Sequence, residues 1–514
     1  MPQKILPRPP TVRLAAVALA AAAALSACAV GPNFRTPEAP AVADAGHPYT
    51  PAPLPASTAS APGPAGAAQS FAQGQDVPAD WWKVFGSPAL DELVQAALQH
   101  NPTLAAAQAS LREAQENYAA DAGARLLPSV TGNLQAARQR AQVSTTADGA
   151  PVAGTYNVFS AGVDVSYSLD LFGANKRALE ALAAQIDYQR FQVEGAWLTL
   201  TANVVATAIQ EASLRAQLKA THDVVDAESK SLVLISKQVE LGALARSAVL
   251  QQRTLIAQTQ AQVPPLEKSL AQTRHQLAVL AGRLPGDGGL PAFELDALHL
   301  AETLPVSVPS SLLRQRPDVR ASEALLHAAS AQVGVATAAQ YPQITLSGSL
   351  DRQSLKLDKF FSNGVTAWSI GAGLVQPIFN GGSLRAQKRA AEAAYDAANA
   401  QYQQTVLNAF LGVANALRAI DTDADALRTD AEAEALAKES LDLIQRQYQL
   451  GAASYLATLD AQRSWLQTRV ALAQAQAGRH ADTAALFQAL GGGWWNSPDA
   501  VAALDAASAP ARAN

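Results

Sequence analysis

The sequence predicts a mixed α/β membrane protein in which each chain contributes four β-strands and long α-helices. Three observations lead to this prediction. Apolar and polar residues alternate strictly in short segments, which is typical of strands with one apolar and one polar face. Two segments of about 67 residues each lack proline and follow coiled-coil spacing. These features recur in the same order in both halves of the chain, which indicates two internal repeats.

The composition excludes several classes of protein. Hydrophobic residues make up 49% of the chain but aromatic residues only 6%, so the apolar content consists mostly of small and aliphatic side chains that favour long helices. A net charge of -5 provides no basic surface for a phosphate backbone, so we expect no nucleic-acid partner. The single cysteine excludes an internal disulfide framework and any multi-cysteine metal site.

The N-terminus has the pattern of a signal peptide over residues 1–27. Three basic residues precede an apolar run from Leu14 to Leu25, which is too short to span a membrane comfortably. The run ends in Leu25-Ser26-Ala27-Cys28, which resembles the box of a bacterial lipoprotein. Cys28 is then the lipid-modified first residue of the mature chain, and the covalent lipid is the only cofactor expected. The alternative is an ordinary cysteine near a cleavage site. Ala29 rather than Asp follows Cys28, which implies the outer membrane.

The mature chain divides into four further segments. Residues 28–87 form a lipid-anchored N-terminal segment, and its Pro/Ala-rich part, residues 29–80, is predicted to be an extended linker. Residues 88–308 form repeat 1 and residues 309–492 repeat 2. Each contains a helix, a β-hairpin, a long helix and a return helix. Residues 493–514 are predicted to be a loose C-terminal tail.

Four segments carry the strand pattern. In the first repeat they are Val130–Gln135 and Phe159–Leu169, and in the second Ile344–Leu350 and Trp368–Val375. Polar loops are expected over residues 136–158 and 351–367. The alternative is a small soluble sandwich whose polar face meets water, but four strands per chain leave two open edges and make a poor independent domain.

Each hairpin is followed by a long helix, over Ala174–Glu240 and Leu384–Leu450. At 1.5 Å per residue, such a helix spans on the order of 100 Å. Its heptad spacing requires a partner helix along most of its length. The chain supplies this partner after a turn at Gly242, where glycine can adopt a left-handed conformation. The return helix of the first repeat, Ala245–Gly282, is expected to break or kink at Pro264–Pro265.

These strands constrain the assembly. A sheet in lipid must close, because no backbone edge can face hydrocarbon. Two chains would give eight strands, a barrel usually filled by side chains, whereas three would give twelve and an aqueous lumen. The sequence therefore predicts a homotrimer with a 12-stranded transmembrane barrel, continued by an α-helical coiled-coil tunnel long enough to cross a periplasm.

Several segments then resemble one family over residues 28–492. The chain resembles outer-membrane efflux proteins of the TolC/OprM type, closest to the lipoprotein subgroup called NodT. The segments are Cys28-Ala29-Val30-Gly31-Pro32-Asn33-Phe34, Trp81-Trp82, Asn101-Pro102, Arg316-Pro317-Asp318-Val319-Arg320, Tyr341-Pro342 and Gln376-Pro377-Ile378-Phe379-Asn380-Gly381-Gly382. The resemblance implies a trimeric exit duct in the outer membrane of a Gram-negative bacterium, with its helices in the periplasm. The implied partners are a periplasmic adaptor, an inner-membrane pump of the RND type and outer-membrane lipid.

The resemblance also implies where the working parts lie. The residues that would contact the adaptor are at the turns between helices: Leu241, Gly242, Ala243, Leu244, Leu450, Gly451 and Ala452. The residues that would form the periplasmic gate are Tyr448, Leu456, Asp460 and Arg463. Asp460 and Arg463 lie three residues apart on one helix face, where an exposed ion pair is the simpler interpretation. The chain departs from some relatives at Ala248, Ala452 and Ala453, which are charged or polar in those proteins.

The sequence also bears on other classes of function. No P-loop, G-x-S-x-G or H-E-x-x-H pattern is present, so we do not expect an enzyme, and any energy for transport must come from a partner. One alternative is a non-conducting, lipid-anchored coiled-coil spacer, which would have no need of strands with an apolar face. Another is a type I protein-secretion conduit of the same architecture. The sequence favours a passive duct for drugs or other small molecules.

Overall fold

The structure is a computed structural model, and it describes residues 29–37, 49–145, 151–307 and 309–497. The chain divides into two units. Unit 1 contains the N-terminal residues as far as Pro37, with Leu111–Gln189 and Ser322–Tyr402, and unit 2 contains the remaining residues. Each unit therefore draws on both halves of the sequence. The helices with residues in both units are α3 (Pro102–Leu126), α4 (Ala174–Glu240), α8 (Pro317–Ala338) and α10 (Ser383–Gln449).

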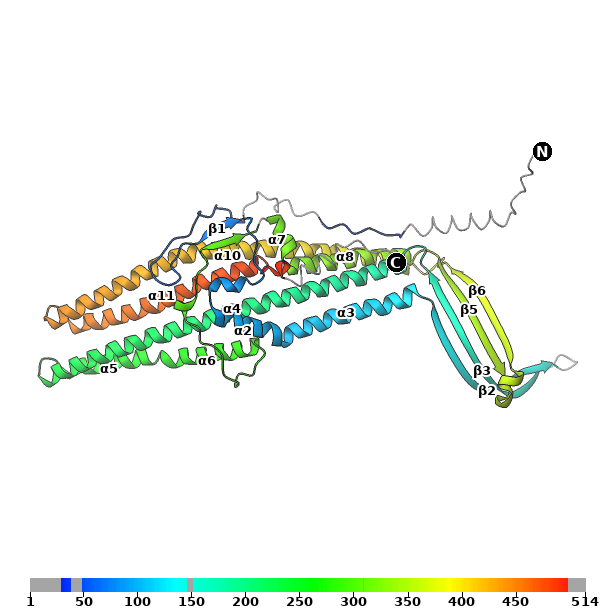
Figure 1. The fold of residues 1–514 in the computed structure, drawn as a ribbon, viewed down its shortest axis with the longest axis horizontal. Helices are drawn as coiled ribbons and strands as arrows, with labels where there is room; N and C mark the ends of the chain where they lie inside the picture. The colour runs from blue at the N-terminus through cyan, green and yellow to red at the C-terminus, as the bar shows by residue number, and fades with distance from the viewer. Residues whose placement is uncertain (1–28, 38–48, 146–150, 308, 498–514) are drawn as a thin grey trace, which may run out of the picture. The chain divides into compact units, whose positions relative to one another are not determined.

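Unit 1 contains an antiparallel sheet with the strand order β2-β3-β5-β6 (Figure 1). The strands are β2 (Ser129–Thr145), β3 (Pro151–Leu169), β5 (Gln343–Ser354) and β6 (Val365–Val375). The edges of the sheet are β2 and β6, and within the described chain no further strand pairs with either. The backbone groups along these edges are therefore free to pair with another chain.

The register of the sheet separates apolar from polar side chains. One row across the four strands is Gly132, Val163, Leu350 and Trp368, and the row beside it is Val130, Val165, Gly348 and Ile370. Trp368 is 73% exposed and Ile370 83% exposed. The opposite face carries mostly small or polar residues. The predicted alternation over Phe159–Leu169 and Ile344–Leu350 is confirmed, because successive residues of a strand point to opposite faces.

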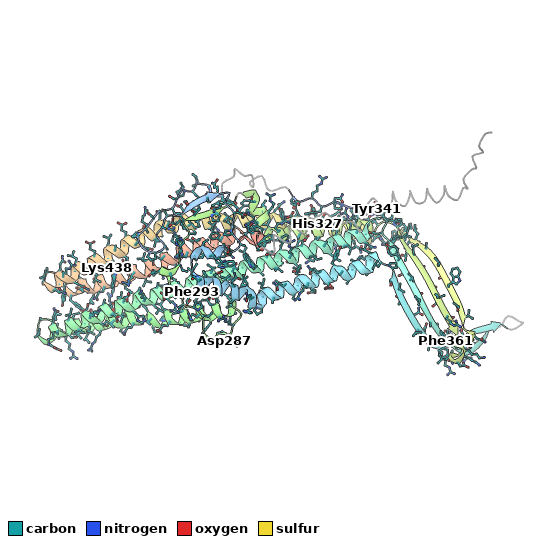
Figure 2. All side chains as sticks on the ribbon, viewed as in Figure 1. Asp287, Phe293, His327, Tyr341, Phe361 and Lys438 are labelled. Atoms are coloured by element: carbon teal, nitrogen blue, oxygen red, sulfur yellow. The ribbon has the colours of Figure 1, made fainter. Side chains whose placement is uncertain are left out.

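Both hairpins are longer than predicted. Residues 136–145 and 151–158 belong to β2 and β3, and the prediction of a polar loop there was wrong. These residues include few large apolar side chains, so the alternation disappears, but the backbone ladder does not depend on it. In the second hairpin, β5 reaches Ser354 and the connection contains a short helix, α9 (Phe360–Asn363), with Phe361 exposed at its surface (Figure 2). Arg352 donates hydrogen bonds to the carbonyls of Phe360 and Phe361 at 2.8 and 2.7 Å.

The prediction of an extended linker is wrong for the described residues near the N-terminus of unit 1. Arg177, only 3% exposed, donates to Oδ1 of Asn33 at 2.7 Å. The ring of Phe34 stacks on His327, labelled in Figure 2, with centroids 4.3 Å apart. Residues 29–37 have an extended backbone but are attached to the rest of unit 1, because side chains from distant helices hydrogen-bond to their polar groups. Composition alone does not reveal such partners.

Residues 49–80 are attached in the same way within unit 2. A short strand, β1 (Ser70–Gln73), pairs in parallel with β4 (Thr303–Val306). Gln69 is fully buried, accepts a hydrogen bond from Arg479 of α11 (Tyr455–Ala489) at 2.7 Å and donates to the carbonyl of Ala301 at 2.8 Å. The linker prediction is therefore wrong here too.

The rest of unit 2 is helical. Helix α4 is followed by α5 (Arg246–Gln260) and α6 (Val263–Leu280), and α10 by α11 (Figure 1). The kink predicted at Pro264–Pro265 is confirmed, and both prolines lie in the first turn of α6, where their missing N–H groups leave no helical bond unmade. The smaller elements are η2 (Trp81–Phe85), α2 (Pro88–His100), η3 (Leu295–Ala297) and α7 (Pro309–Gln315). Of the helices that the structure describes, none is long and apolar enough to cross a membrane.

The C-terminal end of unit 2 also differs from the prediction. The chain turns at Gly491–Gly493, and Trp494 is 5% exposed and donates its indole N–H to the carbonyl of Gln315 at 2.6 Å. Trp495 donates to Asp76 at 3.1 Å. The loose tail predicted from residue 493 is therefore wrong as far as residue 497, because each indole has a partner for its N–H. Residues 498–514 lie outside the described chain.

Candidate functional site

The two turns predicted to contact an adaptor lie at the same end of unit 2 (Figure 1). Gly242 and Gly451 each have φ +76°, and an added Cβ at either would meet no atom within 4 Å. Leu241 is 74% exposed and Leu450 84% exposed. Of the other predicted contact residues, Ala243 and Ala452 are exposed, and Leu244 is half-buried against an apolar cluster.

Matching hydrogen bonds close the two turns. The N–H of Ala243 donates to the carbonyl of Gln238, and that of Ala452 to the carbonyl of Gln447, both at 2.8 Å. Each bond spans a glycine in the left-handed conformation, which is the arrangement of a Schellman motif. Both turns therefore end a helix at a glycine beside an exposed leucine, and the space next to each glycine is open.

Three of the four predicted gate residues share one face of α11. Leu456, Asp460 and Arg463 are spaced by four and three residues, and all are exposed. Oδ1 of Asp460 lies 3.8 Å from Nη1 of Arg463, with 66% and 50% of the two side chains exposed. Arg463 also donates to Oε1 of Gln258 at 3.4 Å. The structure thus brings these three residues together as an exposed patch.

Tyr448 does not belong to that patch. It is half-buried, and its hydroxyl donates to Oε1 of Gln238 on α4 at 2.7 Å. Its ring lies 5.9 Å from that of Tyr455, which is buried in the cluster that joins α4, α5 and α11. Burial raises the pKa of both phenols, so both stay protonated and act as hydrogen-bond donors at neutral pH.

Behind the exposed patch lies a buried polar network that the sequence analysis missed. The hydroxyl of Tyr455 donates to Oε1 of Gln252 on α5, and Nε2 of Gln252 donates to the carbonyl of Glu228 on α4 at 2.9 Å. Gln462 of α11 donates to the hydroxyl of Ser231 on α4 at 3.0 Å. The bonds of Tyr455 and Gln462 join one helical hairpin to the other, and that of Gln252 to Glu228 joins the two helices of the first hairpin. A signal was present, because Gln252-Arg253 and Gln462-Arg463 occupy corresponding positions in the two halves of the sequence.

Glu228 is the acidic member of this network. Its side chain is fully buried, and Oε1 accepts a hydrogen bond from the hydroxyl of Thr259 at 3.1 Å. Oε2 has no hydrogen-bond partner among the described residues. Burial raises the pKa of Glu228 to about 7, although the charge of Arg463 acts in the opposite direction.

In unit 1, the polar face of the sheet carries two carboxylates. Asp164 and Asp351 lie in neighbouring rows, and the described strand residues that share this face include no Lys or Arg. Nδ2 of Asn133 donates to Oδ2 of Asp164 at 2.6 Å. A Cβ added at Gly162 would lie 1.9 Å from Oδ1 of Asp351, so the absence of a side chain there makes room for this carboxylate. The face is therefore polar and anionic.

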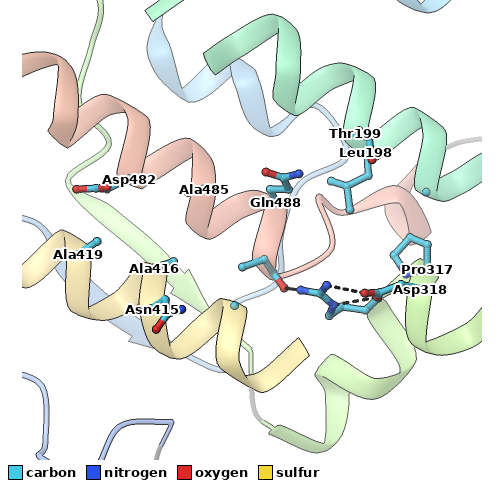
Figure 3. Close-up of a pocket in the computed structure, with 14 residues that line it drawn as sticks. Leu198, Thr199, Pro317, Asp318, Asn415, Ala416, Ala419, Asp482, Ala485 and Gln488 are labelled. Atoms are coloured by element: carbon cyan, nitrogen blue, oxygen red, sulfur yellow. Dashed lines mark hydrogen bonds and ion pairs between the residues drawn. The ribbon is translucent and has the colours of Figure 1, made fainter. Parts of the chain in front are cut away.

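A cavity of about 500 Å³ lies beside Arg316, Pro317 and Asp318 in unit 2 (Figure 3). Arg316 donates to the carbonyl of Ala489 at 2.7 Å and to both carboxylate oxygens of Asp318, at 3.0 and 2.7 Å. This motif therefore connects the start of α8 to the end of α11. Among the described residues, no group of three or more His, Cys, Asp or Glu side chains is arranged to hold a metal ion.

Cys28 lies outside the described residues, so its lipidation stays a prediction. The neighbouring chain is well defined: the N–H of Val30 donates to the carbonyl of Phe172 at 3.1 Å. A Cβ added at Gly173 would lie 2.6 Å from that of Ala29, so the N-terminal segment passes closely over this glycine. The residue after Cys28 is thereby held where the chain leaves β3 and enters α4.

The sheet has an exposed apolar face, a polar opposite face and unpaired edges, and the chain also contains long paired helices. This combination is typical of the class of outer-membrane channels. The chain belongs to the outer membrane efflux protein family, whose model matches residues 93–283 and 308–492. This family comprises efflux channels rather than enzymes, so the protein is an outer-membrane efflux channel of a Gram-negative bacterium.

Individual relatives agree with this assignment. The chain is 34% identical over 432 residues to the pyoverdine export outer membrane protein OpmQ of Pseudomonas aeruginosa, covering 83% of this chain and 90% of that protein. It is 30% identical over 480 residues to the toluene efflux pump outer membrane protein TtgC of Pseudomonas putida, covering 92% and 94%. The structure matches the outer-membrane channel OprN with a TM-score of 0.79 and 29% identity, covering 91% of this chain and all of that one.

Proposed function

We propose that three copies of the chain close into a 12-stranded barrel, with the apolar face toward lipid and the polar face toward a water-filled lumen. The observation that carries this proposal is the pair of unpaired edge strands, β2 and β6, on a sheet with an exposed apolar face. Four strands cannot close on themselves, and an open edge in hydrocarbon leaves backbone groups without partners. Joining β6 of one chain to β2 of the next satisfies both edges.

In this assembly the long helices continue from the barrel as a coiled-coil tunnel in the periplasm. Helices α4 and α10 are both 67 residues long, and each follows two strands and precedes a return helix. This matching order supports an internal duplication, with repeat 1 over residues 88–308 and repeat 2 over residues 309–492. The tunnel ends at the turns around Gly242 and Gly451.

The proposed gate is the exposed patch of Leu456, Asp460 and Arg463, repeated around the three-fold axis. Three copies of Asp460 form an acidic ring, which binds cations and is held by contacts with neighbouring groups. Tyr448 acts from behind the patch by joining α10 to α4 through Gln238. The exposure of the patch within one chain supports this role, because groups that meet across an axis lack cover in the single chain.

The protein acts as a passive exit duct of a tripartite system. Its proposed partners are a periplasmic adaptor, which contacts the accessible backbone of the two tips, and an inner-membrane pump of the RND type, which supplies the energy. Relatives named for pyoverdine export and toluene efflux support small molecules as substrates. Lipid on Cys28 anchors the N-terminal segment at the outer membrane, and the attachment of residues 29–37 to unit 1 supports a fixed position for this anchor.

The test is single-channel recording of the purified protein in a planar bilayer, with its mass in detergent measured in parallel. A trimeric mass with a small, discrete conductance is expected. A monomeric mass would contradict the closed barrel. If inserted protein conducts no ions, the coiled-coil spacer becomes the better description. If fluorescent small substrates are retained while a secreted polypeptide passes, the protein-secretion conduit becomes the better description.

A further inference from the structure

Glu228 stands out among the carboxyl groups of the tip half of unit 2. It is fully buried on α4, with one oxygen bonded to Thr259 and the other without a partner. Buried carboxylates are ordinarily paired with a cation or fully hydrogen-bonded, because an isolated charge in the interior is costly. Glu211, another fully buried glutamate of α4, follows this rule: Arg215 lies 2.9 Å from its Oε1. The surroundings of Glu228 therefore favour a neutral carboxylic acid.

The groups that face Glu228 are mostly neutral. Helix α5 presents Thr259 and Gln252, and the amide of Gln252 donates to the backbone carbonyl of Glu228. Helix α11 presents the phenol of Tyr455 and the guanidinium of Arg463, the titratable groups whose charges interact with this carboxyl. Since 50% of the Arg463 side chain is exposed, water weakens the effect of its charge on Glu228 without removing it, and the contact is no salt bridge.

Glu228 also lies within the contact layer between the two helical hairpins. The charged side-chain hydrogen bonds that cross from α4 and α5 to α11 are Arg463 with Gln258 and Arg469 with Asp223, and the charged side chains in them are 30–50% exposed. Three others that cross to α10 and α11 join neutral groups: Tyr448 with Gln238, Tyr455 with Gln252, and Gln462 with Ser231. Apolar side chains of α4, α5 and α11 pack beside them. Ionising Glu228 would introduce one charge into this layer, and the layer must then loosen or admit water.

Arg463 links this buried carboxyl to the proposed gate. Its guanidinium lies 3.8 Å from Asp460 on the exposed face, and its charge also reaches Glu228 behind that face. A neutral Glu228 leaves Asp460 as the carboxylate that attracts Arg463. An ionised Glu228 attracts the same guanidinium inward, which weakens its interaction with Asp460.

We propose that Glu228 is a positioning residue for the gate: it holds a proton while the two hairpins are packed together and loses it as they separate, so that the tip opens more readily at alkaline pH. This inference rests on the proposed gate. It assigns to the tip a response to protons that acts through Arg463, separately from contact with an adaptor.

The direction and size of the effect follow from linkage. The pKa of Glu228 is raised from 4.5 to about 7 when the hairpins are packed. A group whose pKa is raised in the packed state stabilises that state fully below the ordinary pKa of the group. This stabilisation is lost as the pH rises through the raised value. With pKa values of 4.5 for the loosened tip and about 7 for the packed tip, opening becomes about tenfold more favourable per chain between pH 6 and pH 8.

The first test is hydrogen–deuterium exchange of the intact protein in detergent at pH 6 and pH 8, corrected for the intrinsic pH dependence of exchange. In the wild type, exchange in α5 and α11 is expected to rise about tenfold beyond that correction. Glu228→Gln keeps the shape of the side chain and cannot ionise, so amide exchange in α5 and α11 of this variant is expected to stay slow at both pH values. Glu240→Gln is the matched control on the same helix, because Glu240 is exposed, and it should behave like the wild type. A flat wild-type profile, or a Glu228→Gln profile like that of the wild type, would overturn the proposal.

A second variant covers the case in which Glu228→Gln does not fold. Arg463→Gln removes the positive charge that favours the ionised form, so the midpoint of the exchange profile is expected to move to higher pH. An unchanged midpoint would overturn the proposal. Single-channel recording then separates the two hypotheses: a conducting protein whose opening does not change with pH contradicts this inference alone. A protein that never conducts contradicts the proposed function, whatever the exchange profile.

Discussion

Replacing Asp460 by alanine is expected to loosen the closed end of the tunnel. Among the described residues of one chain, the ionic partner of Asp460 is Arg463, at 3.8 Å, and both side chains are at least half exposed. That pair lies within one helix and is kept on opening, so the loss concerns the contacts that Asp460 makes with neighbouring copies in the proposed trimer. An exposed ion pair there contributes about 0.2–1 kcal/mol. Three copies act together in the proposed trimer, so the closed state loses about 0.6–3 kcal/mol. At 1.4 kcal/mol per factor of ten, the ratio of open to closed channels rises by about threefold to a hundredfold.

The assay is the open probability of single channels in a planar bilayer, followed by uptake of large antibiotics by cells carrying the variant. The chain offers a matched control in Asp425→Ala, which breaks another exposed ion pair three residues apart, with Asp425 and Arg428 2.8 Å apart on α10. That variant should conduct like the wild type. If Asp460→Ala and Asp425→Ala both match the wild type, the gate does not depend on Asp460. An equal rise in both variants would show that any lost surface charge loosens the tunnel.

Three further predictions concern the anchor, the pore and the N-terminal segment. Cys28→Ser should abolish incorporation of radiolabelled palmitate, and continued labelling would place the lipid elsewhere. Replacing both Asp164 and Asp351 by Asn should move the reversal potential in a tenfold KCl gradient toward zero, because carboxylates in a lumen favour cations; an unchanged potential would mean that these residues do not line the conducting path. Arg177→Ala removes a buried, charged hydrogen-bond donor that contributes about 1.5–3 kcal/mol. Trypsin should therefore cleave after Arg35 about tenfold to a hundredfold faster. Lys176→Ala, at an exposed neighbouring position, should leave the cleavage rate unchanged.

The long helices and the strand segments were predictable because their signals are local. Residues 174–240 contain no proline and keep a heptad spacing, and α4 has these bounds. The alternation over Phe159–Leu169 likewise predicted the part of β3 that has an apolar face. The rest of β3 was missed because its residues lack that contrast, and a strand can form through its backbone ladder alone.

The spatial grouping of the proposed gate residues could be predicted only in part. Leu456, Asp460 and Arg463 follow helical spacing, so a shared face was expected, and the structure has it. Tyr448 was grouped with them, yet its partners are Gln238 and Tyr455, which are distant in sequence or on another helix. Glu228 was not identified at all, because nothing near it in the sequence distinguishes a buried glutamate from an exposed one.

The sequence by itself determined the periods of the helices and strands, the turns at Gly242 and Gly451 and the segments shared with the family, since each depends on neighbouring residues. Only the tertiary structure decided which groups meet across long separations: Arg177 with Asn33, Trp494 with Gln315, and Glu228 with Thr259. The physical reason is that burial and hydrogen bonding between distant groups depend on how the helices pack, and burial in turn raises the pKa of Glu228.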